Sequence, residues 1–155
     1  MTIRFAEIRD IPVMIDLLKQ VGQVHHQIRP DLFRAGAQKY DEAALEALLK
    51  DKTRPIFIAE EEGMAKGYCF CILQVTENDP VLCDRKVLYI DDLCVDEKYR
   101  GQGIARALYE HTLDYARSLS CDAVTLNVWY GNDAQIFYEK CGMKPQKTGM
   151  EFVLC

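Results

Sequence analysis

The sequence has no long apolar run, no surplus of positive charge and no cysteine pair at metal-binding spacing. No apolar segment approaches the roughly 18 residues of a membrane helix, and the opening MTIRFAEIRD carries charges where a signal peptide is apolar. A net charge of -5 argues against a protein whose main task is to neutralise nucleic-acid phosphates. We therefore expect a cytoplasmic protein that binds neither a membrane nor nucleic acid.

The cysteines point to packing rather than to metal or disulfide chemistry. There are 7 of them, an odd number, mostly inside apolar stretches and without a C-x-x-C pair. Zinc needs ligands that converge, whereas Cys69 and Cys71 belong to an expected strand and not to a metal-binding motif. We read the cysteines as small core residues and expect no metal site.

Length and composition favour one folded unit spanning residues 1–155. A chain of 155 residues with 49% hydrophobic residues can bury a sizeable core, and single cores of about 100–200 residues are common. No internal repeat, low-complexity tract or linker divides the sequence. One domain is therefore the simplest organisation.

Hydrophobic periodicity predicts the order βααβββαβαβ. Asp10 and Pro12 mark the start of the first helix, and residues 22–40 lack a sustained period, which is typical of a binding loop. This order predicts a mixed sheet with helices packed against it, an α/β fold. The expected strands are 3–6, 56–59, 67–75, 87–95, 123–128 and 152–154, and the later helices are 41–50, 104–119 and 134–141.

The most informative segment runs from Leu93 to Ala105, where a strand leads into a glycine-bearing turn and then a helix. The first amides of a helix lack intrahelical partners and favour an anion. Gly101 and Gly103 allow close backbone approach, and Arg100 can add a charge-assisted contact. The segment matches neither the Walker loop nor the dinucleotide-binding motif. Taken alone, it could also be an ordinary turn before a helix.

Three motifs in order resemble the GCN5-related N-acetyltransferase (GNAT) family. Residues 100–105, RGQGIA, match its R/Q-x-x-G-x-G/A signature. Residues 89–95, YIDDLCV, resemble the preceding strand, and residues 137–143, FYEKCGM, resemble the late helix and the strand after it. The opening IRFA with Asp10 also resembles the start of the family fold, so the likeness spans nearly the whole chain.

The resemblance implies acetyl-coenzyme A as the acetyl donor. It places the pyrophosphate on the turn and the pantetheine along the strand 87–95, which in this family splays from the next strand, here 123–128. Unpaired strand edges attract such partners. The thioester carbonyl would lie near the Val95 amide. The implied cofactor-binding residues are Leu93, Cys94, Val95, Arg100, Gly101, Gln102, Gly103, Ile104 and Ala105.

Tyr138, Asp91 and Asp92 are the candidate catalytic residues. Tyr138 resembles the family tyrosine that protonates the departing thiolate, although it also borders an apolar helical stripe and could simply pack there. An ammonium acceptor must lose a proton to a base or a water relay. Strand alternation predicts opposite faces for the two carboxylates. The resemblance places the proton-accepting carboxylate of the family at Asp91, so we prefer it as the base, with Asp92 close behind. Either carboxylate could instead hold the ammonium or make a structural hydrogen bond.

One position departs from the family pattern. Family members commonly carry an asparagine seven residues before the tyrosine, whereas Asn132 lies six before Tyr138. At about 100° per residue, six steps miss the helix face that seven would reach. Asn132 could therefore contact coenzyme A differently, or it could cap the late helix through the capping-box spacing of residues 132–135.

The resemblance also implies the acceptor side, because in this family the region after the first helix shapes the acceptor pocket. His25, His26 and Arg29 lie there, and Trp129 follows the strand that flanks the thioester. Adjacent histidines do not share a helix face, so we expect at most one of them to point inward. A solvated histidine pair, or a Trp129 in the core or at a subunit contact, is the alternative.

The sequence thus predicts an N-acetyltransferase that moves the acetyl group of acetyl-coenzyme A directly to a primary amine of a small molecule or peptide. Cys94 is a conceivable acyl nucleophile, but no histidine or carboxylate pattern marks it as activated. The alternatives are a non-catalytic acyl-coenzyme A sensing module and a nucleotide-phosphate binder. Homodimers are common among such proteins, and these residues leave the oligomeric state open.

Overall fold

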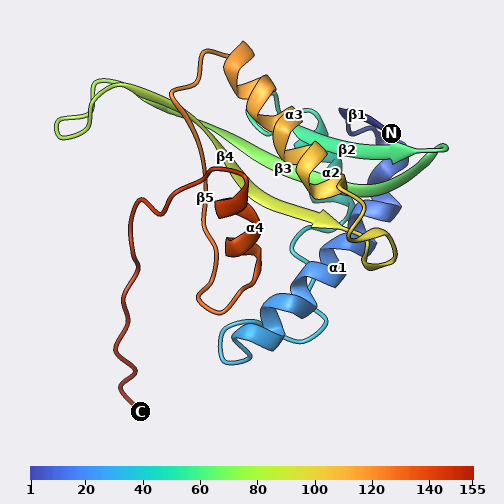
Figure 1. Cartoon of the computed structure of the whole chain (residues 1–155), viewed down its shortest axis with the longest axis horizontal. Helices are drawn as coiled ribbons and strands as arrows, with labels where there is room; N and C mark the ends of the chain where they lie inside the picture. Colours follow the sequence, from blue (N-terminus) through green and yellow to red (C-terminus); the bar gives the residue numbers. More distant parts are fainter.

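The computed structural model describes residues 1–155 and shows a mixed sheet whose strands follow one another in chain order, β1-β2-β3-β4-β5 (Figure 1). The first four strands pair antiparallel, and β4 and β5 pair parallel. This confirms the predicted α/β class. The strands are β1 (Thr2–Phe5), β2 (Ile56–Glu61), β3 (Met64–Thr76), β4 (Arg85–Val95) and β5 (Ala123–Leu126).

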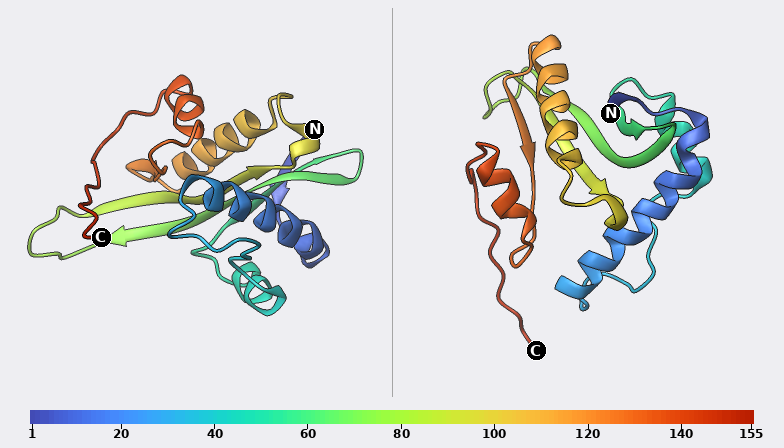
Figure 2. Two further views of the ribbon diagram at one scale, coloured as in Figure 1. Left: turned by 90° about the horizontal axis from the view of Figure 1, so that it is seen from below. Right: turned by 45° about the vertical axis from the view of Figure 1, so that its right-hand side comes forward.

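Helices cover both faces of this sheet (Figure 2). α1 and α2 pack on one face, α3 packs on the other, and α4 lies near β5. None of them combines the length and the apolar character needed to cross a bilayer. The α-helices are α1 (Ile11–Ile28), α2 (Glu42–Leu49), α3 (Ile104–Ser118) and α4 (Ala134–Lys140), and the 3-10 helices are η1 (Ile8–Asp10) and η2 (Glu97–Tyr99).

The alternation of side chains along β2, β3 and β4 divides the core into two layers. Phe57, Cys69 and Leu88 pack with Leu108 of α3. Ile58 and the other members of the second layer pack with α1 and α2. Period-two alternation sends successive side chains to opposite faces, so each strand serves both layers. The second layer comprises Ile11, Met14, Leu17, Leu18, Leu45, Ile56, Ile58, Tyr68, Phe70 and Cys94.

β4 breaks this alternation at one point. Phe70 pairs with Asp92, whereas the next residue of β3, Cys71, pairs with Ile90, so Asp91 is the extra residue of a β-bulge. In a bulge, two residues oppose one on the partner strand, and the strand bends locally. The expectation that Asp91 and Asp92 face opposite sides is therefore wrong, since both carboxylates bind tyrosines that pack on Phe70.

The parallel pair β4 and β5 separates just before that bulge. Their register runs from Val87 opposite Ala123 to Ile90 opposite Leu126, where β5 ends. Beyond Ile90, β4 continues to Val95 with β3 on one side and no strand on the other. The predicted separation is confirmed, although β5 ends at Leu126 and not at residue 128.

Two sequence expectations fail. α1 continues to Ile28, so residues 22–28 are helical and the irregular segment begins at Arg29. Residues 152–154 form no strand, because no segment of the chain lies alongside them to accept backbone hydrogen bonds. The order of the remaining elements is as predicted.

Asp10 stabilises the start of α1 through an ion pair rather than through a cap. It is 4% exposed, and Arg4 donates to both of its oxygens at 2.8 and 2.9 Å. Its Oδ2 also accepts from the Glu7 amide at 2.7 Å. Burial opposes ionisation, but the Arg4 and Glu7 hydrogen bonds prevail and lower the pKa of Asp10. Arg4 also binds Glu60, so it joins β1, β2 and α1.

Replacing Arg4 by methionine is expected to reduce the free energy of unfolding by about 2–4 kcal/mol at pH 7, because it leaves a buried carboxylate unpaired. Since the pKa of Asp10 is lowered in the folded protein, this stabilisation is lost as the pH falls through that pKa. Arg9, which is 58% exposed and binds Glu7 and Glu60, is the matched control. Urea titration of both variants would measure the free energy of unfolding, and Arg9→Met should lower it by less than about 1 kcal/mol. Equal losses for the two variants would contradict the assignment.

Candidate active site

The turn between β4 and α3 has the geometry of an anion cradle. Gly101 and Gly103 adopt φ angles of 79° and 82°, in the left-handed region that favours glycine. Gly103 is the N-cap of α3 and supplies no side-chain cap, so the first amides of the helix remain free for a ligand. An added Cβ at either glycine would meet nothing within 4 Å, which shows open space above the turn.

Arg100 precedes the two glycines of this turn and binds the end of β4. Its Nε donates to the Val95 carbonyl at 3.2 Å, while the residue as a whole remains exposed. A polar cleft of about 390 Å³ lies between α1 and this arginine. Its lining residues are Asp16, Lys19, Gln20, Gln23, Val24, Gln27, Glu97 and Arg100. The guanidinium therefore sits where the turn and the cleft meet.

The free edge of β4 carries Leu93, Cys94 and Val95 toward that turn. Opposite them, Gly67 of β3 permits close packing, because a Cβ there would lie 2.9 Å from the Cys94 carbonyl oxygen. The Cys94 side chain points to α1, and its Sγ lies 3.6 Å from the Leu17 carbonyl. Burial raises the pKa of this thiol to about 12. Cys94 is therefore a packed thiol at neutral pH and not a thiolate.

Asp92 is a poorly solvated carboxylate at the bulge. Burial raises its pKa from 3.8 to about 6, although the Tyr68 hydroxyl, which donates to Oδ2 at 2.6 Å, works in the opposite direction. Tyr68 is fully buried and packs edge-on against Phe70. A carboxylate with this pKa is ionised at pH 7.5 and is a stronger base than an ordinary aspartate.

Asp91 has a different environment on the same aromatic cluster. Lys39 donates to its Oδ2 at 2.8 Å and the Tyr40 hydroxyl donates to the same oxygen at 3.1 Å. Tyr40 stacks on Phe70, which also contacts Tyr68. Both carboxylates therefore bind tyrosines that pack around one phenylalanine, on the face covered by α1 and α2.

Lys39, Tyr40 and Tyr68 are site residues that sequence reasoning missed. They lie 24 to 52 positions from the carboxylates that they bind. For Lys39 and Tyr40 the nearest signal was the irregular stretch before α2, which indicated a binding loop without singling out a residue. Tyr68 lies in β3, where no sequence signal marked it. Burial lowers the pKa of Lys39, but the Asp91 hydrogen bond outweighs it and raises the pKa overall. Lys39 is thus a stable ammonium held on Asp91.

Tyr138 lies on the opposite side of the sheet plane, in the layer that contains α3. Its side chain is partly buried against that core layer. Its ring centroid lies 6.2 Å from that of Tyr109 and 5.1 Å from that of Phe137. Burial, together with nearby ionisable groups including Asp92, raises the pKa of its phenol. The hydroxyl is therefore protonated at any physiological pH and able to donate.

Asn132 makes a structural contact at the start of α4. Its Oδ1 accepts from the Ala134 amide at 2.9 Å, and its carbonyl accepts from the Gln135 amide at 3.2 Å. The N-cap of α4 is Asp133, without a side-chain cap hydrogen bond, and Gln135 binds Glu139, so the capping box expected for residues 132–135 does not form. Contact between Asn132 and a cofactor remains a prediction.

The four candidate acceptor residues gather around Phe33. The His25 ring lies tilted against the Phe33 ring with 4.9 Å between centroids, and Trp129 meets the Phe33 ring edge-on with 5.5 Å between centroids. Arg29 lies over the Trp129 ring at 5.6 Å. His26 Nδ1 lies 2.7 Å from the Phe33 carbonyl oxygen. Both histidines therefore contact Phe33, because the segment after α1 folds back over the helix end.

His25 is partly buried. Burial lowers its pKa, and the positive charge of Lys39 lowers it further. At neutral pH the ring is therefore neutral. Tyr130, next to Trp129, is 97% exposed.

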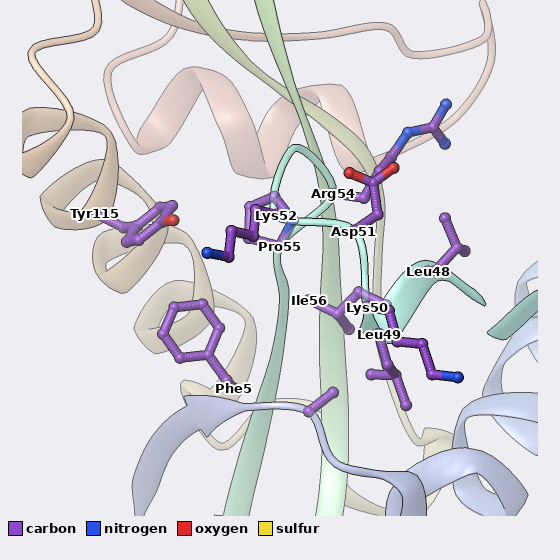
Figure 3. A pocket seen from close by; sticks show the side chains of 11 residues that line it. Phe5, Leu48, Leu49, Lys50, Asp51, Lys52, Arg54, Pro55, Ile56 and Tyr115 are labelled. Atoms are coloured by element: carbon purple, nitrogen blue, oxygen red, sulfur yellow. The ribbon is translucent and has the colours of Figure 1, made fainter. Parts of the chain in front are cut away.

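A second hollow lies away from these residues (Figure 3). Its volume is about 320 Å³, and it lies between Phe5, the end of α2, Ile56 and Tyr115 of α3. No residue of the carboxylate cluster, the glycine turn or the Phe33 cluster lines it. Across the whole chain, no three histidine, cysteine or acidic residues gather as a set of metal ligands.

A parallel strand pair that separates beside a glycine turn is the arrangement that the resemblance to the acetyltransferase class predicted. Residues 22–143 match the sequence model of the Acetyltransferase (GNAT) family, and the chain belongs to this family. A 28% identical match over 102 residues links it to glucosamine 6-phosphate N-acetyltransferase of Arabidopsis thaliana, covering 61% of this chain and 62% of that protein. The chain spans less than two thirds of the length of the curated relatives that it matches.

Solved structures agree with this fold. A point mutant of the BH1408 protein from Bacillus halodurans is 33% identical, with a TM-score of 0.95 over 100% of both chains. The aminoglycoside N-acetyltransferase AAC(6')-Iy in complex with CoA has a TM-score of 0.72 and 16% identity, covering 98% of both chains. The second likeness supports the fold alone.

Proposed function

We propose that this protein is an N-acetyltransferase that moves the acetyl group of acetyl-coenzyme A directly to a primary amine. One observation carries the proposal. β4 loses its partner β5 at Ile90, immediately before two carboxylates, and then leads into a left-handed glycine turn with free helix amides. An unpaired strand edge that could bind the cofactor, a candidate base and a turn that could bind phosphate thus lie on one continuous segment.

The residues of this segment fit the donor. The amides of Gln102, Gly103, Ile104 and Ala105, with Gly101 and the Arg100 guanidinium, would hold the pyrophosphate. The open space above the two left-handed glycines leaves room for it. Leu93, Cys94 and Val95 would offer the unpaired edge of β4 to the pantetheine amides. When bound, the donor supplies an activated acetyl thioester.

The chain must also remove a proton from the ammonium acceptor. Asp92 suits this task best, because burial raises its pKa to about 6, close to neutrality. Asp91 is engaged by Lys39 and Tyr40, which makes it a better anchor for a cation than a base. We therefore assign proton acceptance to Asp92, directly or through water, and cation binding to Asp91. This reverses the preference drawn from the sequence.

Tyr138 completes the mechanism as the hydrogen-bond donor to the departing thiolate. Its raised pKa keeps the phenol protonated, and because full proton transfer to a thiolate whose thiol has a pKa of about 8.5 is uphill, the phenol would stabilise that charge by a hydrogen bond while the proton comes from water. Tyr138→Phe is expected to lower kcat by at least about tenfold, with little change in the affinity for acetyl-coenzyme A. Steady-state kinetics with calorimetric titration of the donor would check both numbers. If the protein were a sensing module, the wild type and Tyr138→Phe would bind acetyl-coenzyme A equally tightly, and neither would catalyse acetyl transfer.

Direct transfer needs no acyl-cysteine. Cys94 is buried against Leu17, and its raised pKa keeps it protonated, so it is a poor nucleophile. Cys94→Ala should keep at least about half of the wild-type turnover if the fold is intact. Complete loss of turnover in a folded Cys94→Ala protein would overturn the direct mechanism.

The acceptor would enter beside the Phe33 cluster, where His25, His26, Arg29 and Trp129 meet. The net charge of -5 and the two carboxylates favour a cationic amine on a small molecule or peptide. Two of the relatives are named for glucosamine 6-phosphate and for aminoglycosides, so the test is release of coenzyme A with a panel of amino sugars, polyamines, amino acids and peptides. Seven free thiols suit a reducing compartment, and we propose that the reaction is cytoplasmic.

A further inference from the structure

The hollow between Phe5, the end of α2, Ile56 and Tyr115 has the size of a small-molecule site (Figure 3). Its volume of about 320 Å³ falls within the usual range for ligand pockets, roughly 300–1,000 Å³. It shares no residue with the glycine turn, the carboxylate cluster or the Phe33 cluster. A ligand of this hollow would therefore be separate from the acetyl donor and its acceptor.

One wall of the hollow is aromatic. Phe5 and Tyr115 meet edge-on with 5.7 Å between ring centroids, and both rings contact Phe57, which is fully buried. The contacts with Phe57 hold the two rings in place. Phe5 is nevertheless 54% exposed, so part of its ring surface faces solvent. Aromatic surface that is held rigidly in a hollow is typical of a site for another ring.

The loop between α2 and β2 supplies much of the remaining lining, and hydrogen bonds fix it on the sheet. The Thr53 carbonyl accepts from the Leu73 amide at 2.8 Å, and the Pro55 carbonyl accepts from the Cys71 amide at 2.9 Å. Asp51 Oδ1 accepts from the amide and the hydroxyl of Thr53 at 2.9 and 2.7 Å. The loop is therefore ordered before a ligand arrives, which lowers the entropic cost of binding.

The same loop brings three basic side chains to the hollow, those of Lys50, Lys52 and Arg54. No carboxylate of the chain lies within ion-pair distance of any of them. Asp51, the one acidic lining residue, is engaged by Thr53. The hollow is thus a local excess of positive charge in a chain whose net charge is -5, and it favours an anion.

Lys52 is the cation on the side of the aromatic wall. Figure 3 shows its ammonium extending toward Phe5 and Tyr115, whereas Lys50 and Arg54 extend to the other side of the hollow. No ring of the chain holds the Lys52 ammonium in a cation–π contact. This charge is therefore free to bind an anionic group whose apolar part lies against the two rings.

We propose that the hollow binds a small aromatic carboxylate, with its ring against Phe5 and Tyr115 and its carboxylate on the Lys52 ammonium. A charge-assisted hydrogen bond fixes one end of the ligand, and ring contacts with burial of apolar surface fix the other. The sign of the charge excludes a cationic ligand, because three unpaired cations would repel it. The inference goes beyond acetyl transfer and does not depend on it.

Titration of the full chain with 4-phenylbutyrate, followed by amide NMR spectra, tests the proposal. We expect saturable shifts among residues 5–6, 48–56 and 115, with a dissociation constant below about 2 mM, as for a ligand of about 12 non-hydrogen atoms. 4-Phenylbutylamine has the same apolar part and the opposite charge, and it should bind at least about tenfold more weakly. Equal binding of the two compounds would overturn the proposal. So would shifts confined to other residues, or no saturation up to about 20 mM.

Variants of the lining residues locate the ligand within the hollow. Lys52→Met should raise the dissociation constant of 4-phenylbutyrate at least about fivefold. Lys50→Met is the matched control on the same loop, and its effect should stay below about twofold. Both lysines are exposed, so the fold should be unchanged, as circular dichroism would confirm. Equal effects of the two variants would overturn the assignment of the carboxylate to Lys52.

The aromatic wall has its own pair of variants. Phe5→Ala should also raise the dissociation constant at least about fivefold, because it removes one of the two rings. Ile8→Ala is the matched control, since Ile8 is 68% exposed and does not line the hollow. It should bind 4-phenylbutyrate like the wild type. If a folded Phe5→Ala protein bound the compound as tightly as Ile8→Ala does, the ligand ring would not lie on this wall and the proposal would fail.

Discussion

Replacing Asp92 by asparagine is expected to lower kcat at pH 8 by at least about 100-fold, the usual contribution of a general base. Asparagine has nearly the same shape and can still accept the hydrogen bond from Tyr68, which lies 2.6 Å from Oδ2. The KM for acetyl-coenzyme A should change by less than about threefold, because the glycine turn is untouched. Steady-state kinetics with the best amine of the acceptor panel would measure both parameters.

The pH profile gives a second readout of the same residue. The pKa of Asp92 is raised to about 6, so a base with this pKa is active above it and is lost as the pH falls below it. The wild-type kcat/KM should therefore fall tenfold per pH unit below about pH 6. The residual activity of Asp92→Asn should lack this limb.

Stability should change in the opposite direction from activity. A carboxyl whose pKa rises from 3.8 to about 6 on folding stabilises the protein when protonated, below pH 3.8, and this stability is lost as the pH rises through about 6. Asparagine mimics the neutral form. At pH 8, Asp92→Asn should therefore have a higher unfolding temperature than the wild type, and its free energy of unfolding should be greater by at most about 3 kcal/mol. At pH 4, the two proteins should have similar stability.

Asp91→Asn is the matched control at the neighbouring position. It breaks the ion pair with Lys39 but leaves Asp92 and Tyr68 in place. We expect its main effect on the KM for a cationic acceptor, with kcat reduced by less than about tenfold. If Asp91→Asn abolished turnover and Asp92→Asn did not, the two roles would have to be exchanged.

Local sequence signals were sufficient where the chemistry resides on one continuous segment. The run from Leu93 to Ala105 could be predicted as a strand, a glycine turn and a helix, because each part depends on neighbours a few positions away. Gly101 and Gly103 do adopt the left-handed conformation that suits glycine. The separation of β4 from β5 could be predicted only from the family resemblance, because no local sequence feature determines where a pair of parallel strands ends.

Interactions between distant residues explain what the sequence did not reveal. The bulge at Asp91 is a property of the pairing between β3 and β4, so period-two alternation could not predict it. The raised pKa of Asp92 results from burial, and the partners of Asp91 arrive from the segment before α2. Ranking two adjacent aspartates as bases therefore required their surroundings in space.

The failed strand at 152–154 has a related cause. Its alternating apolar residues are a genuine β pattern, but a strand also needs a neighbour with free backbone groups. The single chain offers none there. Local pattern thus predicted the tendency of the segment, and only the arrangement of the whole chain shows that the tendency is unmet.

Replacing Gly103 by valine is expected to raise the KM for acetyl-coenzyme A at least about 100-fold. Its φ of 82° is strained for a β-branched residue, and the new side chain would fill the open space where the first amides of α3 meet the phosphates. The loss of two or three charge-assisted hydrogen bonds is enough for an effect of this size. Calorimetric titration with acetyl-coenzyme A would measure the affinity directly.

Gly63 provides the matched control for backbone strain. It has a φ of 74° in the turn between β2 and β3, and an added Cβ there also meets nothing within 4 Å. Gly63→Val should lose a similar free energy of unfolding, about 1–2 kcal/mol, while binding acetyl-coenzyme A like the wild type. If Gly103→Val bound the donor as well as Gly63→Val does, the phosphate would have to lie elsewhere, and the catalytic roles assigned along β4 would lose their common anchor.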